Sequence, residues 1–550
     1  MADHIDQATI QSTMRLIRDR DWLPLLRYTE QPDTVQRRLL STILSSQRDT
    51  QFGRRYRFAS IRSYEEFVQA VPVLEYEDLR QDIEGQEQSG ERLLNAEQPV
   101  HYVQTSGTTG KPKYVPLIQS AIDWIGQYQR LFSYAQWVGV PGIYDGSVLV
   151  IAGQPVEGRL SGGAPYGSMS GLMNEGLPQA IRGKSVLPDG ILRVADYRLK
   201  YLRMAACALA GETLSVLATP NPSTLLKLLD VIRSEFPLLV EALAVGPRHP
   251  ILSQGTAWTE PIPVQADRLA YLRTLLGAPS TLTLALLWPE LRAVITWTGG
   301  NCGALIPKLR ALVQKHTAVI EMGYLSSECL GSLNVDVREN RCIPTFQEHI
   351  FEFMEVADGD DQMTDPILLG DLQQGKKYQV LVTTRSGLYR YAMNDIVEVT
   401  GWFNQVPTVR FVQKGKGVTN ITGEKLYEHQ VLEAVETVLK KSGLACEFYV
   451  MLADVSSAGY TLYLEQTTVP SSFSREVDEQ LARLNVEYQA KRESGRLQPL
   501  HVVLLQDGTA EAYRRHCVAK GQRDAQFKLI RLQYGQDCSF DFSQHIRERA

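Results

Sequence analysis

A run of small and basic residues beginning at Thr105 has the composition of a phosphate-binding loop. A β-like lead at residues 101–104 runs into Thr105-Ser-Gly-Thr-Thr-Gly-Lys-Pro-Lys113. Glycines let backbone N–H groups approach phosphate oxygens, hydroxyls donate further hydrogen bonds, and lysines neutralise phosphate charge. The alternative is a solvent loop, because Ser, Thr and Gly mark loops in general. The candidate phosphate ligands are Thr105, Ser106, Gly107, Thr108, Thr109, Gly110, Lys111 and Lys113.

A second candidate cluster contains Tyr324, Ser326, Ser327 and Glu328. The tyrosine ring offers a flat face for an adenine base, the serines offer hydroxyls, and Glu328 offers a hard oxygen to Mg²⁺. Taken alone, a tyrosine and a glutamate four residues apart are more often the buried and exposed sides of one helix. With the phosphate loop upstream, the same residues favour a nucleotide site that binds ATP with Mg²⁺.

The loop resembles the phosphate-binding signature of adenylate-forming enzymes, and its spacing differs from that of P-loop nucleotide hydrolases. Other segments resemble one branch of that superfamily, the acyl-acid amido synthetases of the GH3 (Gretchen Hagen) family. Those segments are Gln51-Phe-Gly-Arg54, Tyr76-Glu-Asp-Leu-Arg80, Leu287-Trp-Pro-Glu290 and residues 324–328. With the downstream motifs in the expected order, the resemblance extends over essentially the whole chain.

The resemblance implies nucleotide contacts in two further segments. Thr298 and Gly299, which follow an apolar strand, are similar to the loop that passes the nucleotide and the acyl group. Asp395 matches the aspartate expected to hold the ribose hydroxyls, as carboxylates do in dinucleotide sites; the alternative is a turn aspartate that ends a hairpin. The chain departs from the family pattern at Ala392-Met-Asn394, which replaces Arg-Val-Gly, so no role of that arginine is carried over.

Lysines near the C-terminal third are candidates by the same resemblance. Lys414 and Lys416 lie in a segment similar to the family hinge, where Gly415 and Gly417 would absorb backbone rotation; a surface turn is equally compatible with either lysine alone. Lys528, in Gln526-Phe-Lys-Leu-Ile-Arg531, matches the lysine expected at the α-phosphate and carboxylate during adenylation. We therefore expect Lys528 and Lys414 to be the catalytic lysines. A surface position is the alternative for Lys528.

The elements that must position these residues form an α/β pattern. Residues 7–49 repeat apolar side chains at helical spacing, and from about residue 100 short strands alternate with helices, which predicts a mixed or parallel sheet covered by helices. The single helices expected downstream include residues 306–316 and 474–494. We expect a large N-terminal adenylation domain at 1–410, a hinge at 411–417 and a small mobile α+β domain at 418–550.

Bulk composition narrows the class of partner. The net charge of −5 provides no basic excess for nucleic acid, and no apolar run approaches the ~20 residues of a membrane helix. Seven scattered cysteines without C-x-x-C spacing suit reduced thiols in the cytoplasm. We predict no nucleic-acid or membrane partner; the oligomeric state stays open.

The expected reaction has two steps. A small carboxylic acid attacks the α-phosphorus of ATP and releases pyrophosphate, and an acceptor then takes the acyl group and releases AMP. The resemblance implies that the acceptor is an amine, usually an amino acid. Two alternatives stay open: a ligase that forms a thioester with coenzyme A or a carrier protein, and a nucleotide-binding protein without turnover. The identity of the acid is not readable. The aromatic residues that follow the loop could line its pocket, and ordinary core or surface positions are at least as compatible with them; they are Trp124, Tyr128, Phe132 and Tyr134.

Overall fold

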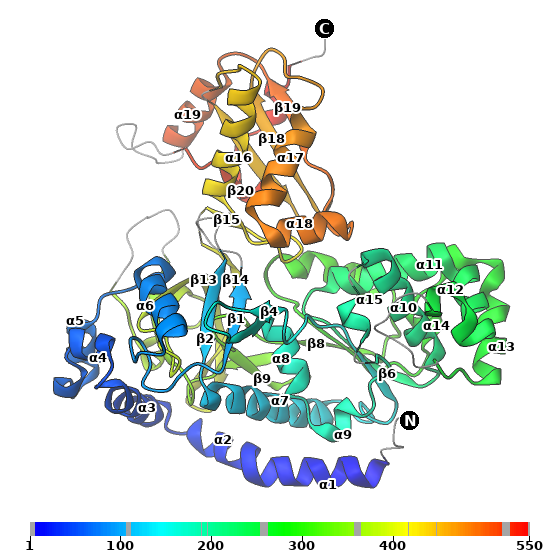
Figure 1. Ribbon diagram of the computed structural model, residues 1–550, viewed down its shortest axis with the longest axis horizontal. Helices are drawn as coiled ribbons and strands as arrows, with labels where there is room; N and C mark the ends of the chain where they lie inside the picture. The colour runs from blue at the N-terminus through cyan, green and yellow to red at the C-terminus, as the bar shows by residue number, and fades with distance from the viewer. Residues whose placement is uncertain are drawn as a thin grey trace. The chain divides into compact units, whose positions relative to one another are not determined.

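The computed structural model describes residues 6–105, 112–188, 190–194, 196–253, 262–356, 365–415, 417–446, 448–519 and 529–547 (Figure 1). The chain separates into two compact units. The first includes Lys113–Val356 and ends at Val412, and the second includes Gln413–Ala550. Each unit has its own hydrophobic core, so each is described by itself.

Four parallel strands form the central sheet of the first unit, in the order β3-β6-β7-β8. Their bounds are β3 Ser147–Val150, β6 Leu214–Ala218, β7 Ala293–Thr296 and β8 Ala318–Glu321. Val216 and Ile295 point to a core shared with helix α7 (Gln119–Gly139), whereas Leu217 and Val294 point to a core with α10 (Tyr197–Ala210) and α11 (Pro222–Val245). Because both faces are buried, the strands are apolar along their length.

Three antiparallel or mixed sheets complete the first unit. One has the order β2-β1-β5-β4, another pairs β9 with β10, and the third has the order β11-β12-β13-β14. Their bounds are β1 His101–Thr105, β2 Lys113–Leu117, β4 Gly158–Arg159, β5 Pro165–Gly167, β9 Ser332–Asp336, β10 Arg341–Pro344, β11 Ile350–Glu355, β12 Lys377–Thr383, β13 Tyr391–Phe403 and β14 Val406–Lys414.

Helices cover these sheets, and several begin where the sequence supplies a cap. Asn221 accepts a hydrogen bond from the Ser223 N–H (2.9 Å), and Pro222 occupies the first turn of α11, as expected at a helix start. Pro237 disrupts the middle of α11, where Glu235 leaves helical geometry. The other helices of this unit are α1 Gln7–Ile17, α2 Leu23–Tyr28, α3 Pro32–Gln47, α4 Gln51–Arg55, α5 Tyr64–Ala70, α6 Tyr76–Ser89, α8 Met169–Glu175, α9 Gln179–Arg182, α12 Pro250–Ser253, α13 Ala266–Thr274, α14 Leu284–Leu287 and α15 Ile306–Arg310.

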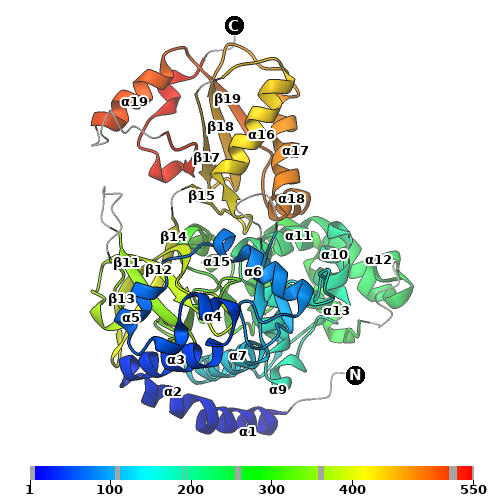
Figure 2. The same ribbon diagram turned by 60° about the vertical axis from the view of Figure 1, so that its left-hand side comes forward.

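The second unit contains a four-stranded sheet in the order β19-β18-β17-β20. Helices α16 and α17 pack side by side on one face of it, and α19 lies on the other (Figure 2). Met451 and Leu462 belong to the core beneath α16 and α17, and Val450 belongs to the core with Tyr513 of α19. The bounds are β15 Val418–Thr419, β16 Leu426–Tyr427, α16 Glu428–Lys441, β17 Tyr449–Asp454, β18 Gly459–Glu465, α17 Phe473–Leu484, α18 Val486–Glu493, β19 His501–Leu505, α19 Thr509–Ala519 and β20 Leu532–Tyr534.

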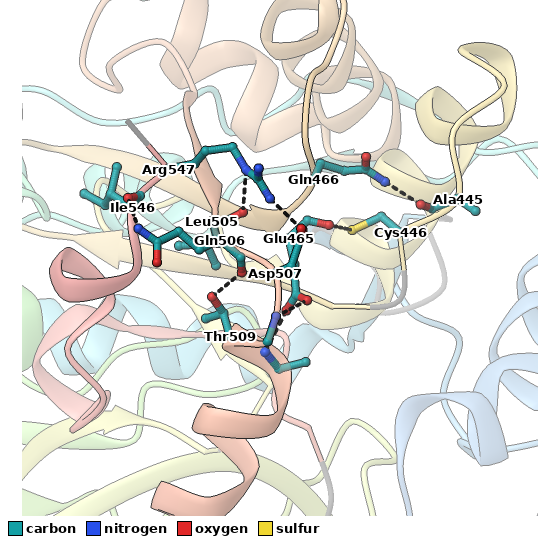
Figure 3. Close-up of polar contacts among 12 residues, drawn as sticks. Ala445, Cys446, Glu465, Gln466, Leu505, Gln506, Asp507, Thr509, Ile546 and Arg547 are labelled. Atoms are coloured by element: carbon teal, nitrogen blue, oxygen red, sulfur yellow. Dashed lines mark hydrogen bonds and ion pairs between the residues drawn. The ribbon is translucent and has the colours of Figure 1, made fainter. Parts of the chain in front are cut away.

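A carboxylate fixes the start of α19. Glu465 accepts hydrogen bonds from the backbone N–H groups of Gly508 (2.8 Å) and Ala510 (2.7 Å). Figure 3 labels Glu465 together with Asp507 and Thr509 of the same segment. A negative charge at a helix N-terminus is stabilising because unpaired N–H groups point towards it. In the same close-up Arg547 donates to the Leu505 carbonyl (3.4 Å) and to Asp507 (2.6 Å). These contacts hold the segment that contains Arg547 along β19.

The predicted class, a large α/β unit and a smaller α+β unit, is confirmed. Two expected helices were wrong in extent. The helix expected at 306–316 ends at Arg310 because the chain turns, with Leu312 accepting from the Ala285 N–H, before entering β8. The helix expected at 474–494 breaks at Asn485, which caps a second helix. Among the described residues, no helix combines the length and apolar character needed to cross a bilayer.

Candidate active site

Two loops with candidate nucleotide ligands emerge from neighbouring strands of the parallel sheet. Thr298 and Gly299 follow β7, and Tyr324 follows β8; the two strands are in register with Thr296 opposite Glu321. Carboxyl ends of parallel strands share one edge, which is where ligands bind in open α/β sheets. The sheet therefore brings both predicted segments to one place.

Tyr324 and Asp395 meet although they come from different sheets. The Tyr324 hydroxyl donates to Asp395 Oδ2 at 2.7 Å, and both side chains are buried. Burial, together with the negative charge of Asp395, raises the pKa of Tyr324 well above its ordinary value. The hydroxyl is therefore a neutral donor that orients the carboxylate predicted to hold the ribose.

The Tyr324 ring also has an aromatic neighbour. Phe411 of β14 stacks on it with 5.8 Å between ring centroids and 8° between ring planes. Gly299 and Gly300 pack beneath Phe411: a Cβ at Gly299 would lie 2.9 Å from the Phe411 carbonyl oxygen. The sequence pattern did not single out Phe411, because a lone aromatic residue in a strand carries no motif.

The residues between Tyr324 and Glu328 form a turn and not a helix, so the single-helix alternative was wrong. Ser326 Oγ accepts from the backbone N–H groups of Glu328 (3.2 Å) and Cys329 (3.1 Å), which holds the turn. Ser327 is partly exposed, and one carboxylate oxygen of Glu328 is fully buried.

The described donor set is compatible with Mg²⁺ bound together with a nucleotide. Within the described part of the chain, no three His, Cys, Asp or Glu side chains gather in a metal-binding cluster. Mg²⁺ commonly uses one or two carboxylates together with substrate phosphates and water. A single glutamate, Glu328, is compatible with that mode of Mg²⁺ binding. One carboxylate does not by itself enclose the ion.

Thr105 and Lys113 bracket the predicted phosphate loop. They are opposite each other in the antiparallel pair β1 and β2. The Lys113 ammonium lies 5.4 Å from the centre of the Tyr76 ring, and Lys113 is 7% exposed. Other predicted residues lie outside the described part of the chain: the phosphate-ligand candidates Ser106, Gly107, Thr108, Thr109, Gly110 and Lys111, and the lysines Lys416 and Lys528. Lys414 is the last residue of β14.

A pocket opens beside the loops, at the same edge of the parallel sheet. The empty space among its lining residues, open solvent included, is about 630 Å³. Of the four aromatic candidates on α7, only Phe132 is among the lining residues. Trp124, Tyr128 and Tyr134 are buried elsewhere in the core. The full lining is Gln129, Phe132, Gln136, Tyr144, Val148, Val150, Ile151, Ala152, Ser170, Met173, Asn174, Leu177, Ile181, Val216, Ala218, Thr219, Pro220, Ile295 and Met322.

The described lining of this pocket contains no charged side chain. Two of its polar groups are already used: Gln129 donates to the Met173 carbonyl (2.8 Å), and Gln136 accepts from the Tyr144 hydroxyl (2.6 Å). Burial raises the pKa of Tyr144, so this hydroxyl stays neutral. The pocket therefore presents mainly apolar surface, a property that aromatic counting along α7 did not reveal.

Three family models match consecutive parts of the chain. The GH3 family N-terminal domain matches residues 24–318, the GH3 family central domain matches 342–414, and the GH3 family C-terminal domain matches 429–535. Indole-3-acetic acid-amido synthetase GH3.4 of Arabidopsis thaliana is 25% identical over 541 residues, which cover 92% of this chain and 89% of that protein. The probable indole-3-acetic acid-amido synthetase GH3.2 of Oryza sativa subsp. japonica is 24% identical, with 91% and 88% covered.

A solved structure shares the fold. AtGH3.15 acyl acid amido synthetase in complex with 2,4-DB superimposes with a TM-score of 0.64 at 20% identity. The match covers 100% of this chain and 98% of that one.

Proposed function

Because this chain belongs to the GH3 family, we propose that it is an ATP-dependent acyl-acid amido synthetase that joins a small apolar carboxylic acid to an amine. The observation that carries the proposal is that one short segment, residues 322–324, contributes to both the apolar pocket and the candidate nucleotide site. Met322 lines the apolar pocket, and two residues later Tyr324 binds Asp395. A nucleotide held by Asp395 would thus lie beside an acid held in the pocket, which is the proximity that adenylation requires.

The protein is a ligase, and its first half-reaction forms an acyl-adenylate. A carboxylate oxygen of the acid attacks the α-phosphorus of ATP, the bond to the β-phosphate oxygen breaks, and pyrophosphate leaves. Asp395 would accept from the ribose hydroxyls, Tyr324 would face the adenine, and the loop from Thr105 to Lys113 would bind the phosphates. Mg²⁺, held through Glu328, would supply charge neutralisation on the phosphates.

The C-terminal lysine would act in the same step. The acid and the triphosphate are both anionic, so a cation between them stabilises the charge of the transition state. The resemblance assigns that role to Lys528. Lys414, at the end of β14, lies in the proposed hinge at 411–417, between the proposed domains 1–410 and 418–550.

The acid class follows from the pocket. An unpaired charge placed against apolar walls would lose its hydration without gaining a partner, so a second carboxylate or an ammonium group on the acid would be disfavoured. We expect acids with an uncharged, apolar body. Ala218→Leu, which adds volume to the pocket wall, should raise KM for the acid and leave KM for ATP unchanged.

In the second half-reaction the amine nitrogen attacks the acyl carbonyl, the bond to the phosphate oxygen of AMP breaks, and the amine proton is released to solvent. An amino acid is the proposed acceptor. The chemistry needs no covalent enzyme nucleophile, and all seven cysteines are free thiols. Reduced thiols also support the proposed cytoplasmic location.

Exchange of labelled pyrophosphate into ATP tests the first half-reaction. Exchange should appear only when an acid is present, and apolar acids should support it better than diacids of similar size. A chain that binds ATP yet shows no exchange with any acid in a broad panel would be a binding protein and not a ligase.

The acceptor is tested separately by mass spectrometry. The enzyme, ATP and a working acid are incubated with mixed amino acids or with coenzyme A. Amide without thioester is the expected outcome; thioester alone would make the chain a thioester-forming ligase.

A further inference from the structure

Glu321, the last residue of β8, was not assigned a role by any sequence pattern. Its carboxylate accepts four hydrogen bonds. Oε2 accepts from the Thr298 N–H (2.7 Å), the Thr298 hydroxyl (2.5 Å) and the Gly299 N–H (3.0 Å), and Oε1 accepts from the Gly323 N–H (2.8 Å). One side chain thus binds both loops of the candidate nucleotide site.

The backbone of Glu321 is itself fixed. Its N–H donates to Asn340 Oδ1 (2.8 Å), and its carbonyl accepts from Asn334 Nδ2 (2.8 Å). Gly323 has a φ of 101°, which only glycine adopts readily, and this conformation accompanies the donation of its N–H to the carboxylate. The carboxylate is therefore held in place before any ligand binds.

Each loop that Glu321 binds leads to a candidate nucleotide contact. Gly323 precedes Tyr324, whose hydroxyl binds Asp395, and whose N–H donates to Ser332 Oγ (2.8 Å). Gly299 packs against Phe411, which stacks on the Tyr324 ring. Releasing either loop would disturb the same aromatic pair.

The N–H groups of Thr298 and Gly299 form a small anion-binding concavity of the kind that elsewhere receives phosphate. Here the anion is the carboxylate of the protein itself. Thr298 and Gly299, which the family resemblance assigns to nucleotide contact, have both of these N–H groups and the hydroxyl hydrogen engaged by Glu321. Thr298 and Gly299 would therefore contribute to nucleotide binding through the conformation of their loop and not through these hydrogen-bond donors.

We propose that Glu321 is a positioning residue for ATP, a carboxylate clip that joins the Thr298–Gly299 loop to the Gly323–Tyr324 turn and holds both in their ATP-binding arrangement. The inference rests on the proposed function only for the identity of the nucleotide. A protein whose binding-competent form is less populated binds its ligand more weakly by that same fraction. Loss of the clip should therefore weaken ATP binding more than it alters bond-making.

The test compares Glu321→Ala and Glu321→Gln in the full chain, with ATP dissociation constants measured by calorimetry without acid. Glu321→Ala should raise the dissociation constant and the KM for ATP at least about tenfold, as expected when hydrogen bonds to a charged acceptor are lost. Glu321→Gln keeps one acceptor oxygen for the Thr298–Gly299 loop and places an NH₂ against Gly323, so it should lie between Ala and wild type.

A matched control is Glu290→Ala, which removes an exposed glutamate paired with Arg292 (2.8 Å) in the same unit. It should leave ATP affinity unchanged. ATP binding by Glu321→Ala within about twofold of wild type, a difference of only ~0.4 kcal/mol, would overturn the proposal. So would a loss that disappears at a lower temperature where the variant is fully folded, because that loss would reflect stability alone.

The outcomes also distinguish failure of the Glu321 proposal from failure of the proposed reaction. If wild type binds ATP but no acid supports pyrophosphate exchange, the proposed function fails while the clip is still tested by ATP affinity. If exchange occurs and Glu321→Ala binds ATP normally, the clip fails and the reaction stands.

Discussion

Tyr324 and Tyr64 of the first unit each donate to a buried carboxylate, and Tyr324 lies at the candidate site. Tyr324 donates to Asp395 at 2.7 Å, and Tyr64 donates to Glu352 at 2.9 Å. Glu352 also pairs with Arg390, so the second pair is a structural contact. The two pairs provide a matched comparison of the same chemistry in two places.

Tyr324→Phe should raise KM for ATP by about tenfold, because a hydrogen bond to a charged group contributes about 1.5–3 kcal/mol. Asp395→Ala should raise it further, since the ribose contact would be lost as well. Tyr64→Phe should lower the melting temperature without changing KM for ATP. The measurement is exchange kinetics across ATP concentrations; equal effects of both Phe variants on KM would contradict a nucleotide role for Tyr324.

Glu348 and His349 are adjacent buried groups with opposite pH dependence. Burial raises the pKa of Glu348 to about 7, although Arg385 at 3.3 Å opposes the shift. Burial, with the positive charge of Arg385, lowers the pKa of His349 to about 3. Between about pH 4.5 and 7 the folded Glu348 keeps a proton that the unfolded chain releases, so its contribution to stability falls as pH rises. Below about pH 6.5 the unfolded chain gains a proton at His349 that the folded protein refuses, so stability falls as pH falls.

The two slopes should therefore cancel in the wild type between about pH 4.5 and 6.5. Glu348→Gln removes one of them, so stability should fall with decreasing pH by up to about 1.4 kcal/mol per unit. His349→Phe should show the reverse trend. Melting temperatures of the three proteins across this range provide the check, and parallel profiles would refute the assignment.

At the scale of helices and strands, the spacing of apolar residues predicted the elements whose burial follows a local pattern. The helical spacing at 7–49 corresponds to α1, α2 and α3, and the apolar strand expected before Thr298 is β7. The breaks were not predicted, because they depend on distant partners. Asn485 ends a helical pattern since its Nδ2 donates to the carbonyls of Glu424 and Lys425.

The residues of the candidate site also fall into a group that the sequence predicted and a group that it did not. Motif order pointed to Tyr324 and Asp395, which the fold brings into contact. The sequence did not predict Glu321 and Phe411 as site residues, because a glutamate at a strand end and a phenylalanine within a strand carry no distinctive spacing. Their roles arise only when two sheets place them beside the loops.

Asn485→Ala tests the helix break in the second unit. The side chain caps α18 through the Tyr488 N–H (2.9 Å) and is 1% exposed. Loss of the cap costs about 1 kcal/mol, and loss of the hydrogen bonds that Nδ2 donates to the carbonyls of Glu424 and Lys425 adds about 0.5–1.5 kcal/mol each. Hydrogen exchange should therefore accelerate in α18 and at residues 424–426.

The control is Ser471→Ala, which changes an exposed serine just before α17. A substitution away from such features changes stability by less than about 0.5 kcal/mol. If both variants exchange alike, the Asn485 contacts do not stabilise this unit.

At the scale of the whole molecule, the proposed division of labour places the ATP contacts in the proposed domain 1–410 and Lys528 in the proposed domain 418–550. Lys528→Ala should slow acid-dependent exchange about 10²–10³-fold, the usual loss on removing one transition-state stabiliser. ATP affinity should be nearly unchanged, and use of supplied acyl-AMP with an amine should be largely spared. Lys440→Ala, an exposed lysine of α16 in the same proposed domain, is the control; equal loss of both half-reactions in Lys528→Ala would contradict the division.

Strand β14 carries the chain from the first unit into the second. It carries Phe411, which stacks on Tyr324, and the second unit begins only two residues later at Gln413. Two residues of fully extended chain span at most about 7 Å. However the second unit turns, this tether keeps its first residue within that radius of Phe411. A bend in the proposed hinge at 411–417 would therefore begin at or next to the aromatic pair of Phe411 and Tyr324.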